Sequence, residues 1–515
     1  MFGMTFLKRG TALASASLLA ALLPLGGCTV GPDFSPPAWI SPASWFGGKQ
    51  EPPPQPKLSY AVAEPINPDW WRLFEDGHLT ELEERVAAEN LDVRIAAIRF
   101  AESRAQLASI RSSEFPSLNA NASYERQKPS NNGVFAAAPN AVGANGAFGN
   151  TTGGVSGRNI SAFDVYQAGF DASWEVDLWG RVRRSVESAT ASEQAAEEAQ
   201  RATLLSNLAE VARDYIQLRG TQEQLRIARE NLRTARQSLR LTQQRAAGGV
   251  TTDLDVANAS AQLRTTAAQI PALEQREAAL INALSLLLGQ PPNALRAKLQ
   301  TPLPVPPVPP TVPVGLPSEL ARRRPDIRQA EAQLHAATAD IGVAVADFYP
   351  SLTLNGSVGL QALQFSHAFD LNSRNYALGP GLTVPLFRGG QLRAQLQLRE
   401  AQQQEAAINY QKTVLQAWHE VDNALTAYRT EQERRVQLQQ AVAENQRAVS
   451  LAQSRYQQGV ADFLTVLDAE RSLLSSQQAL ADSTTNVSAN LVALYKALGG
   501  GWETNMPLRQ QTARK

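Results

Sequence analysis

Phe115-Pro116-Ser117-Leu118 returns later in the chain as Tyr349-Pro350-Ser351-Leu352, at an offset of 349 − 115, or 234 residues. Further matches have an offset of 459 − 249, or 210 residues; they include Arg245, Gly249-Val250 and Leu254, which return as Arg455, Gly459-Val460 and Leu464. Two ungapped blocks of matches indicate a duplicated unit of helix, strand, strand and helix. The main length difference between the two copies must lie between the strands.

Each copy contains a long helical pattern. Residues 181–247 include no proline, and their apolar residues recur in steps of three and four, as in a heptad seam. One helix of this length would be about 100 Å long. Gly248-Gly249 ends the pattern, which then turns back. We predict helical hairpins over 181–288 and 390–498, the second with its turn at Gly459.

Apolar and polar residues alternate in two segments of each copy. The alternation predicts strands at about 117–125, 163–177, 351–362 and 375–385, with Pro380 weakening the last one. Strands of about ten residues with one apolar face are typical of a barrel wall between lipid and a wet lumen. A soluble sheet with one packed face is the alternative. Carboxylates at polar positions and aromatics near the strand ends favour the membrane.

After the N-terminal segment the sequence has no apolar run of 18 or more residues, so we expect no transmembrane helix. If the chain crosses a bilayer, it must do so with strands, because lipid offers backbone groups no hydrogen-bonding partners. Four strands are too few to close a barrel. Several copies would therefore have to combine their strands.

The N-terminus has the pattern of an export signal. Lys8 and Arg9 precede an apolar stretch over 11–25, and Leu25-Gly26-Gly27 leads to Cys28, the single cysteine of the chain. This pattern resembles a bacterial lipobox, so we expect removal of residues 1–27 and lipid attachment at Cys28. A plain secretory signal with an incidental cysteine is the alternative. One cysteine also excludes an intramolecular disulfide.

Proline-rich segments separate the remaining parts. Residues 28–68 are expected to form an extended, lipid-anchored tether, and residues 301–317 a linker between the two copies. The first repeat then covers 69–300, the second 318–500, and a C-terminal tail 501–515.

Nothing in the sequence indicates catalysis or nucleic-acid binding. The 48 basic and 48 acidic residues balance, which gives no reason to expect a nucleic-acid partner. No phosphate-binding loop or nucleophile motif occurs. The four histidines have no metal-ligand spacing: His78, His335, His367 and His419. We expect no enzyme activity, and no cofactor other than a covalent lipid on Cys28.

Several motifs resemble those of TolC-like outer-membrane efflux channels, in particular the NodT-type lipoproteins of RND efflux systems. They are Cys28-Thr29-Val30-Gly31-Pro32-Asp33-Phe34, Trp70-Trp71-Arg72-Leu73-Phe74, Asp177-Leu178-Trp179-Gly180-Arg181, Arg324-Pro325-Asp326-Ile327-Arg328 and Pro385-Leu386-Phe387-Arg388-Gly389-Gly390. The resemblance extends over nearly all of the chain that would follow the export signal.

The resemblance implies an α+β membrane protein that forms a homotrimer. Its fold would be a twelve-stranded outer-membrane β-barrel, four strands per chain, continuous with a long periplasmic α-helical barrel. Such a protein is the passive exit duct of a tripartite efflux pump for drugs or other toxic small molecules. Its partners would be outer-membrane lipid, a periplasmic adaptor and an inner-membrane RND-type pump. The alternatives are a type I protein-secretion duct and a periplasmic coiled-coil scaffold lipoprotein that does not span the membrane.

The same resemblance places a constriction where the hairpin tips converge. Asp255 and Asp468 match positions of the family's constriction, whereas Thr465 stands where a familiar member has Asp. Copies of one carboxylate around an axis repel one another and attract cations. The alternative role of such aspartates is to complement a helix dipole.

The hairpin turns are candidate contacts with the adaptor, because exposed tips are within reach of a partner. They consist of Gly248, Gly249, Val250 and Thr251 in the first repeat and Gly459, Val460, Ala461 and Asp462 in the second. Their alternative role is helix termination.

Overall fold

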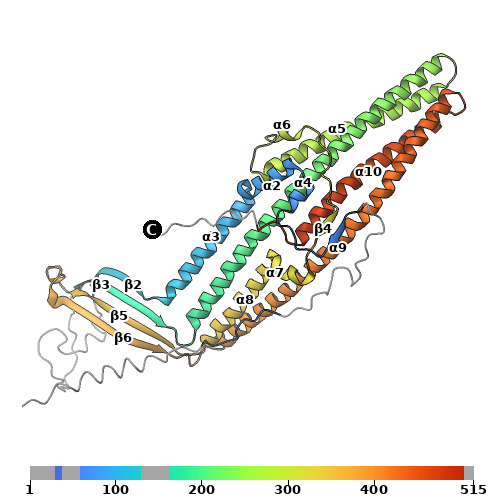
Figure 1. The fold of residues 1–515 in the computed structure, drawn as a ribbon. Helices are drawn as coiled ribbons and strands as arrows, with labels where there is room; N and C mark the ends of the chain where they lie inside the picture. The colour runs from blue at the N-terminus through green and yellow to red at the C-terminus, as the bar shows by residue number, and fades with distance from the viewer. Residues whose placement is uncertain (1–28, 38–57, 129–161, 504–515) are drawn as a thin grey trace, which may run out of the picture. The chain divides into compact units, whose positions relative to one another are not determined.

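A computed structural model describes residues 29–37, 58–128 and 162–503 (Figure 1). The expected export signal, the lipid site at Cys28, residues 38–57 of the tether and residues 504–515 of the tail lie outside these residues. None of the helices in the described part combines the length and apolar content needed to cross a membrane.

The element order confirms the duplication. The first copy comprises α3 (Leu91–Arg111), β2 (Ser117–Gln127), β3 (Phe163–Val176), α4 (Arg181–Ala247) and α5 (Asp253–Leu287). The second comprises α8 (Pro325–Ala346), β5 (Ser351–Ala362), β6 (Arg374–Thr383), α9 (Gln391–Gln457) and α10 (Phe463–Ala497). Helices α4 and α9 both have 67 residues, and α5 and α10 both have 35.

The change of offset has a structural cause. The connection between β2 and β3 covers residues 128–162, and its counterpart between β5 and β6 covers 363–373. The difference, 35 − 11 or 24 residues, equals the difference between the offsets of 234 and 210. The length change therefore lies between the strands, as the sequence predicts.

The described residues divide into two compact units, and each contains parts of both repeats. One unit includes Ala105–Thr190 and Ala336–Gln403, and holds the sheet of β2, β3, β5 and β6. The other includes Ser35–Arg104, Ala191–His335 and the chain from Gln404 onward. Helices α3, α4, α8 and α9 continue from one unit into the other.

The sheet is antiparallel, with strand order β2-β3-β5-β6. Its register separates apolar from polar residues. One cross-strand row is Ala120, Phe170, Val358 and Tyr376; a row of the opposite face is Asn119, Asp171, Ser357 and Ala377. Within one chain the apolar face is uncovered: 83% of Tyr376 and 54% of Phe170 are exposed. Such a face requires an apolar environment.

Pro380 lies within β6, opposite Leu354. Within one chain β6 is an edge strand of the sheet, a position at which proline occurs in natural sheets. The strand that the sequence predicts least firmly is therefore present.

Seven shorter elements belong to the second unit. They are β1 (Tyr60–Val62), η1 (Trp70–Phe74), α2 (Gly77–Glu89), α6 (Arg296–Leu299), β4 (Thr311–Pro313), η4 (Pro317–Glu319) and α7 (Leu320–Arg323). Three further 3-10 turns, η2 (Ser112–Glu114), η5 (Phe365–His367) and η6 (Leu371–Ser373), flank the strands.

Strands β1 and β4 pair in parallel, which joins the end of the expected tether to the expected linker. The sequence predicts no sheet here, because both segments are rich in proline. The pairing is possible because the prolines supply carbonyls rather than N–H groups: Tyr60 N–H donates to Pro310 O at 3.2 Å.

Residues 500 and 501 also belong to this core, although the sequence predicts a tail that begins at residue 501. Trp70 stacks on Tyr495 at 5.5 Å, and its Nε1 donates to Gly500 O at 3.1 Å. Gly501 has φ +117°, and a Cβ there would lie 2.8 Å from Trp70 Nε1. Only glycine permits this close approach.

The two repeats are closed by equivalent joints. Asn90 Nδ2 donates to Leu287 O at 2.8 Å, and Arg324 Nη1 donates to Ala497 O at 2.8 Å. Residues 90 and 324 differ by 234, and residues 287 and 497 by 210. Each joint thus ties the start of a repeat's first helix to the end of its hairpin, with a different side chain doing so in each copy.

Glu83 on α2 is a candidate source of pH-dependent stability. Its side chain is fully buried, neither carboxyl oxygen has a hydrogen-bond partner, and burial raises its pKa well above the usual value. A raised folded-state pKa makes burial most favourable at acidic pH and progressively costly as pH rises. We expect Glu83→Gln to match the parent near pH 4.5 and to have the higher melting temperature at pH 8.

Thermal unfolding in detergent at several pH values measures this difference. Glu102→Gln, an exposed glutamate on α3, is the control. Parallel pH profiles for the two variants would show that Glu83 has no such effect.

Candidate gate at the hairpin tips

Both hairpin tips are built by the same backbone motif. Gly249 and Gly459 have φ of +73° and +76°, which ends the helices α4 and α9 in a left-handed residue. Val250 N–H donates to Arg245 O, and Val460 N–H to Arg455 O, each at 2.9 Å. The predicted tip glycines Gly249 and Gly459 therefore act as helix terminators, and both are exposed.

The next helices begin with N-caps whose residue types are exchanged between repeats. In the first repeat Thr252 is the cap and Asp255 completes a capping box. In the second, Asp462 is the cap, and Thr465 donates its N–H to Asp462 Oδ1 at 3.1 Å and its hydroxyl at 2.7 Å. Residues 252 and 462, like 255 and 465, differ by 210. The second repeat therefore has threonine at position 465, where the first has aspartate, but it carries an aspartate at the cap position instead.

The cap hydrogen bonds keep these carboxylates charged. The Thr251 hydroxyl, followed by the Thr252 backbone and hydroxyl, lowers the pKa of Asp255. The Thr465 hydroxyl and N–H lower the pKa of Asp462. Because the pKa of each group is lower than that of an ordinary aspartate, neither group changes its charge near neutral pH. The structure therefore shows Asp255 in the helix-capping role.

Asp468 differs from the other predicted gate residues. It is exposed, one turn further into α10 than Thr465, and makes no hydrogen bond or ion pair within the described residues. Asp255 and Thr465 are held by caps, whereas Asp468 is free to interact beyond its own chain.

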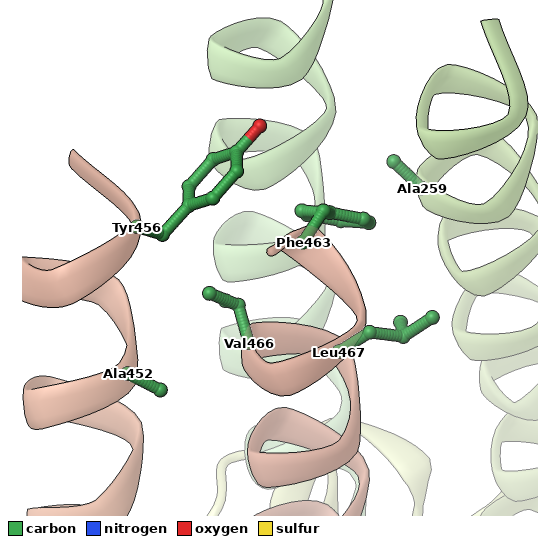
Figure 2. Close-up of a cluster of buried hydrophobic side chains, with 6 residues drawn as sticks. All are labelled: Ala259, Ala452, Tyr456, Phe463, Val466 and Leu467. Atoms are coloured by element: carbon green, nitrogen blue, oxygen red, sulfur yellow. The ribbon is translucent and has the colours of Figure 1, made fainter. Parts of the chain in front are cut away.

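A small apolar cluster joins the two hairpins behind the tips (Figure 2). It comprises Ala452 and Tyr456 of α9, Phe463, Val466 and Leu467 of α10, and Ala259 of α5. The rings of Tyr456 and Phe463 lie 5.7 Å apart at 60°. Leu239 and Leu241 of α4 pack against its edge.

Arg245 of α4 ties the first hairpin to the end of α9. Its Nη1 donates to Tyr456 O at 3.0 Å and to Gln457 O at 3.3 Å, and its guanidinium lies 4.5 Å from the Tyr456 ring centroid. A cation at the C-terminus of a helix also complements its dipole. The sequence does not predict this role, although Arg245 and Arg455 are among the residues that match between the two repeats.

Polar pairs continue the junction along the hairpins. Ser238 donates to Glu470 at 2.7 Å and Asn231 to Gln477 at 2.9 Å, which join α4 to α10. Helices α5 and α10 are joined by two more pairs: Arg471 donates to Gln262 at 2.9 Å, and Gln478 to Gln269 at 2.8 Å. Partly exposed pairs of this kind can exchange with water, so they align the hairpins without making the junction rigid.

Comparison with known proteins decides the family. The family model for outer membrane efflux proteins matches residues 82–290 and 316–500, which correspond to the two repeats. The chain belongs to the outer membrane efflux protein family.

The similarity to individual members extends over almost the whole chain. The toluene efflux pump outer membrane protein TtgI of Pseudomonas putida is 35% identical, over 94% of this chain and 98% of that protein. Outer membrane protein OprJ of Pseudomonas aeruginosa is 34% identical, over 97% and 98%. The structure of the outer-membrane channel OprN has a TM-score of 0.82 and 34% identity, covering 92% of this chain and all of that one.

This outer membrane efflux protein is therefore the outer-membrane component of an efflux system, with the TolC-like channel fold. The junction formed by Arg245 and the apolar cluster lies at the hairpin tips of this fold.

Arg245→Ala tests how firmly the hairpins are joined. A charge-assisted hydrogen bond and a cation–π contact together contribute on the order of 2 kcal/mol. We expect backbone hydrogen exchange in the last turn of α9 to accelerate by about tenfold or more.

Arg240→Ala, which removes an exposed arginine of the same helix, is the matched control. Equal exchange rates in the two variants would mean that Arg245 does not hold the tip.

Proposed function

We propose that three copies of this chain form one passive duct through which a tripartite pump exports small organic molecules. The observation that carries this proposal is the sheet. It has four strands of 10 to 14 residues, an exposed apolar face, and outer strands β2 and β6 that pair with nothing else in the described chain. About ten residues suffice for a tilted strand to cross a bilayer. Three such sheets would supply twelve strands and pair all outer strands with one another.

The lipid anchor would attach beside the strand-to-helix junction. Thr29, the residue after Cys28, lies against Gly180, and Val30 N–H donates to Trp179 O at 3.1 Å. Arg184, almost fully buried, donates to Asp33 Oδ1 at 2.6 Å. These contacts hold residues 29–33 next to residues 179–184. We propose that the Cys28 lipid enters the same leaflet that the base of the sheet would contact.

The tips are the proposed docking surface for a periplasmic adaptor, which would connect the duct to an inner-membrane RND-type pump. Each tip exposes one valine and one leucine at matching positions: Val250 and Leu254 in the first repeat, Val460 and Leu464 in the second. Two identical exposed apolar pairs per chain are suited to a partner that presents the same surface repeatedly.

The substrate class rests on the relatives. TtgI is named for toluene efflux, and a second relative from P. putida for solvent efflux. No nucleotide-binding or proton-relay motif occurs in the sequence, so the energy would come from the pump.

Conductance of the purified protein in planar lipid bilayers tests the proposal. A duct of this kind gives discrete conducting steps from a species that migrates as a trimer until heated. A monomer that is released from membranes when Cys28 is replaced by serine, and never conducts, would instead identify a periplasmic scaffold. Export of a secreted polypeptide, with unchanged sensitivity to solvents and drugs in a deletion strain, would identify a type I duct.

Asp468 is the proposed gate carboxylate. Three copies facing one axis would repel one another and concentrate cations. We expect Asp468→Ala to raise single-channel conductance or reduce cation preference in bilayers. Asp253→Ala, which removes an exposed carboxylate at the start of α5, is the control and should leave both nearly unchanged. Unchanged conductance and selectivity in Asp468→Ala would remove this residue from the constriction.

A further inference from the structure

At the hairpin tips, Arg245 of the first repeat contacts the end of α9 in the second repeat. Arg245 reaches across to the final carbonyls of α9, those of Tyr456 and Gln457. The repeat equivalents of these residues follow from the offset of 210. Arg455 corresponds to Arg245, and Ala246 and Ala247 of α4 correspond to Tyr456 and Gln457.

Arg455 has the side chain for the same contact, but the part of the chain that the structure describes gives it no acceptor. It is exposed, and within the described residues its guanidinium makes no hydrogen bond or ion pair. Its backbone is nevertheless fixed as in the first repeat, because Arg455 O accepts the Val460 N–H at 2.9 Å, as Arg245 O accepts that of Val250. The two arginines therefore leave their helices at equivalent positions.

The last carbonyls of α4 likewise have no side-chain donor among the described residues. Ala246 O accepts Gly249 N–H at 2.9 Å, just as Tyr456 O accepts Gly459 N–H at 3.0 Å. Tyr456 O accepts the arginine as well, whereas no side chain of the described residues donates to Ala246 O or Ala247 O. Carbonyls at a helix C-terminus carry partial negative charge and favour a cationic donor.

Resting on the proposed three-copy duct, we infer that Arg455 of one copy donates to the carbonyls of Ala246 and Ala247 in the neighbouring copy. Around such a duct the repeats alternate, so each second repeat is followed by the first repeat of another copy. The contact within the chain and the contact between copies then form one ring of six arginine-to-helix-end junctions.

The junction between copies is the weaker of the two kinds. Ala246 offers no ring, so the cation–π contact between Arg245 and Tyr456 has no counterpart. The polar pairs between the hairpins also have no counterpart between copies, because the equivalent positions in the other repeat carry small residues. At an offset of 210, the equivalents are Ala441 and Ala267 for Asn231–Gln477, Ala479 and Ala268 for Gln269–Gln478, and Ala448 and Ser260 for Ser238–Glu470.

Arg455 is thus the polar contact that remains where small residues otherwise face one another. An interface of small side chains without polar pairs separates at a lower free-energy cost than an interface with hydrogen bonds. The tip would therefore part first between copies, with Arg455 as the latch.

Thiol cross-linking tests this contact directly, because Cys28 is the single natural cysteine. The double variant Arg455→Cys with Ala247→Cys is treated with a bifunctional thiol reagent about as long as the arginine side chain it replaces. We expect covalent dimers and trimers on a denaturing gel, and monomers from either single variant. The pair Arg245→Cys with Gln457→Cys is the matched reference, and should link within one chain only.

If the reference pair links and the protein migrates as a native trimer, but the pair at 455 and 247 gives monomers only, the inferred contact is wrong while the duct stands. If no trimer exists, both proposals fail. A functional measurement supports the same distinction: Arg455→Ala should increase the conducting fraction in bilayers, whereas Arg447→Ala, an exposed arginine two turns earlier on α9, should not. Equal behaviour of these two variants would also overturn the latch.

Discussion

The fold depends on a sheet that one chain cannot complete. Strands β2 and β6 form its outer edges, and its apolar face is exposed over all four strands. Unpaired N–H and C=O groups at a sheet edge are unfavourable in lipid, and an exposed apolar face is unfavourable in water. One arrangement removes both costs: the edge strands of separate copies pair, and the apolar face contacts the bilayer. The family assignment agrees with this requirement, because the matched relatives are outer-membrane efflux proteins.

Duplication explains how a single chain builds nearly identical parts with different chemistry. The helix lengths, the left-handed glycines and the closing joints all recur at fixed offsets. The side chains at equivalent positions have nevertheless diverged: Asn90 and Arg324 close the same joint, and the threonine and aspartate of the tip caps have exchanged places. Backbone geometry is therefore preserved, while the side chains that make the contacts at the joints and tips differ between the two repeats.

Much of this architecture could be predicted because it is periodic. Alternation located β5 at Ser351–Ala362, and glycines located the ends of α4 and α9. The missed features depend on contacts between residues far apart in sequence: the pairing of β1 with β4, the insertion of Gly501 beside Trp70, and the reach of Arg245 to α9. The interpretation of Asp255 was ambiguous for the same reason, since only the positions of Thr251 and Thr252 show that it caps a helix. Local sequence patterns predict helices and strands, whereas the role of a side chain depends on contacts with residues far away in the sequence.

Single-particle electron microscopy of the full-length protein, purified in detergent, tests this architecture most directly. We predict three copies around an axial pore, with β6 of each copy hydrogen-bonded to β2 of the next. A lone subunit without a pore, or a sheet whose β2 and β6 edges are covered by another part of the same chain, would contradict it.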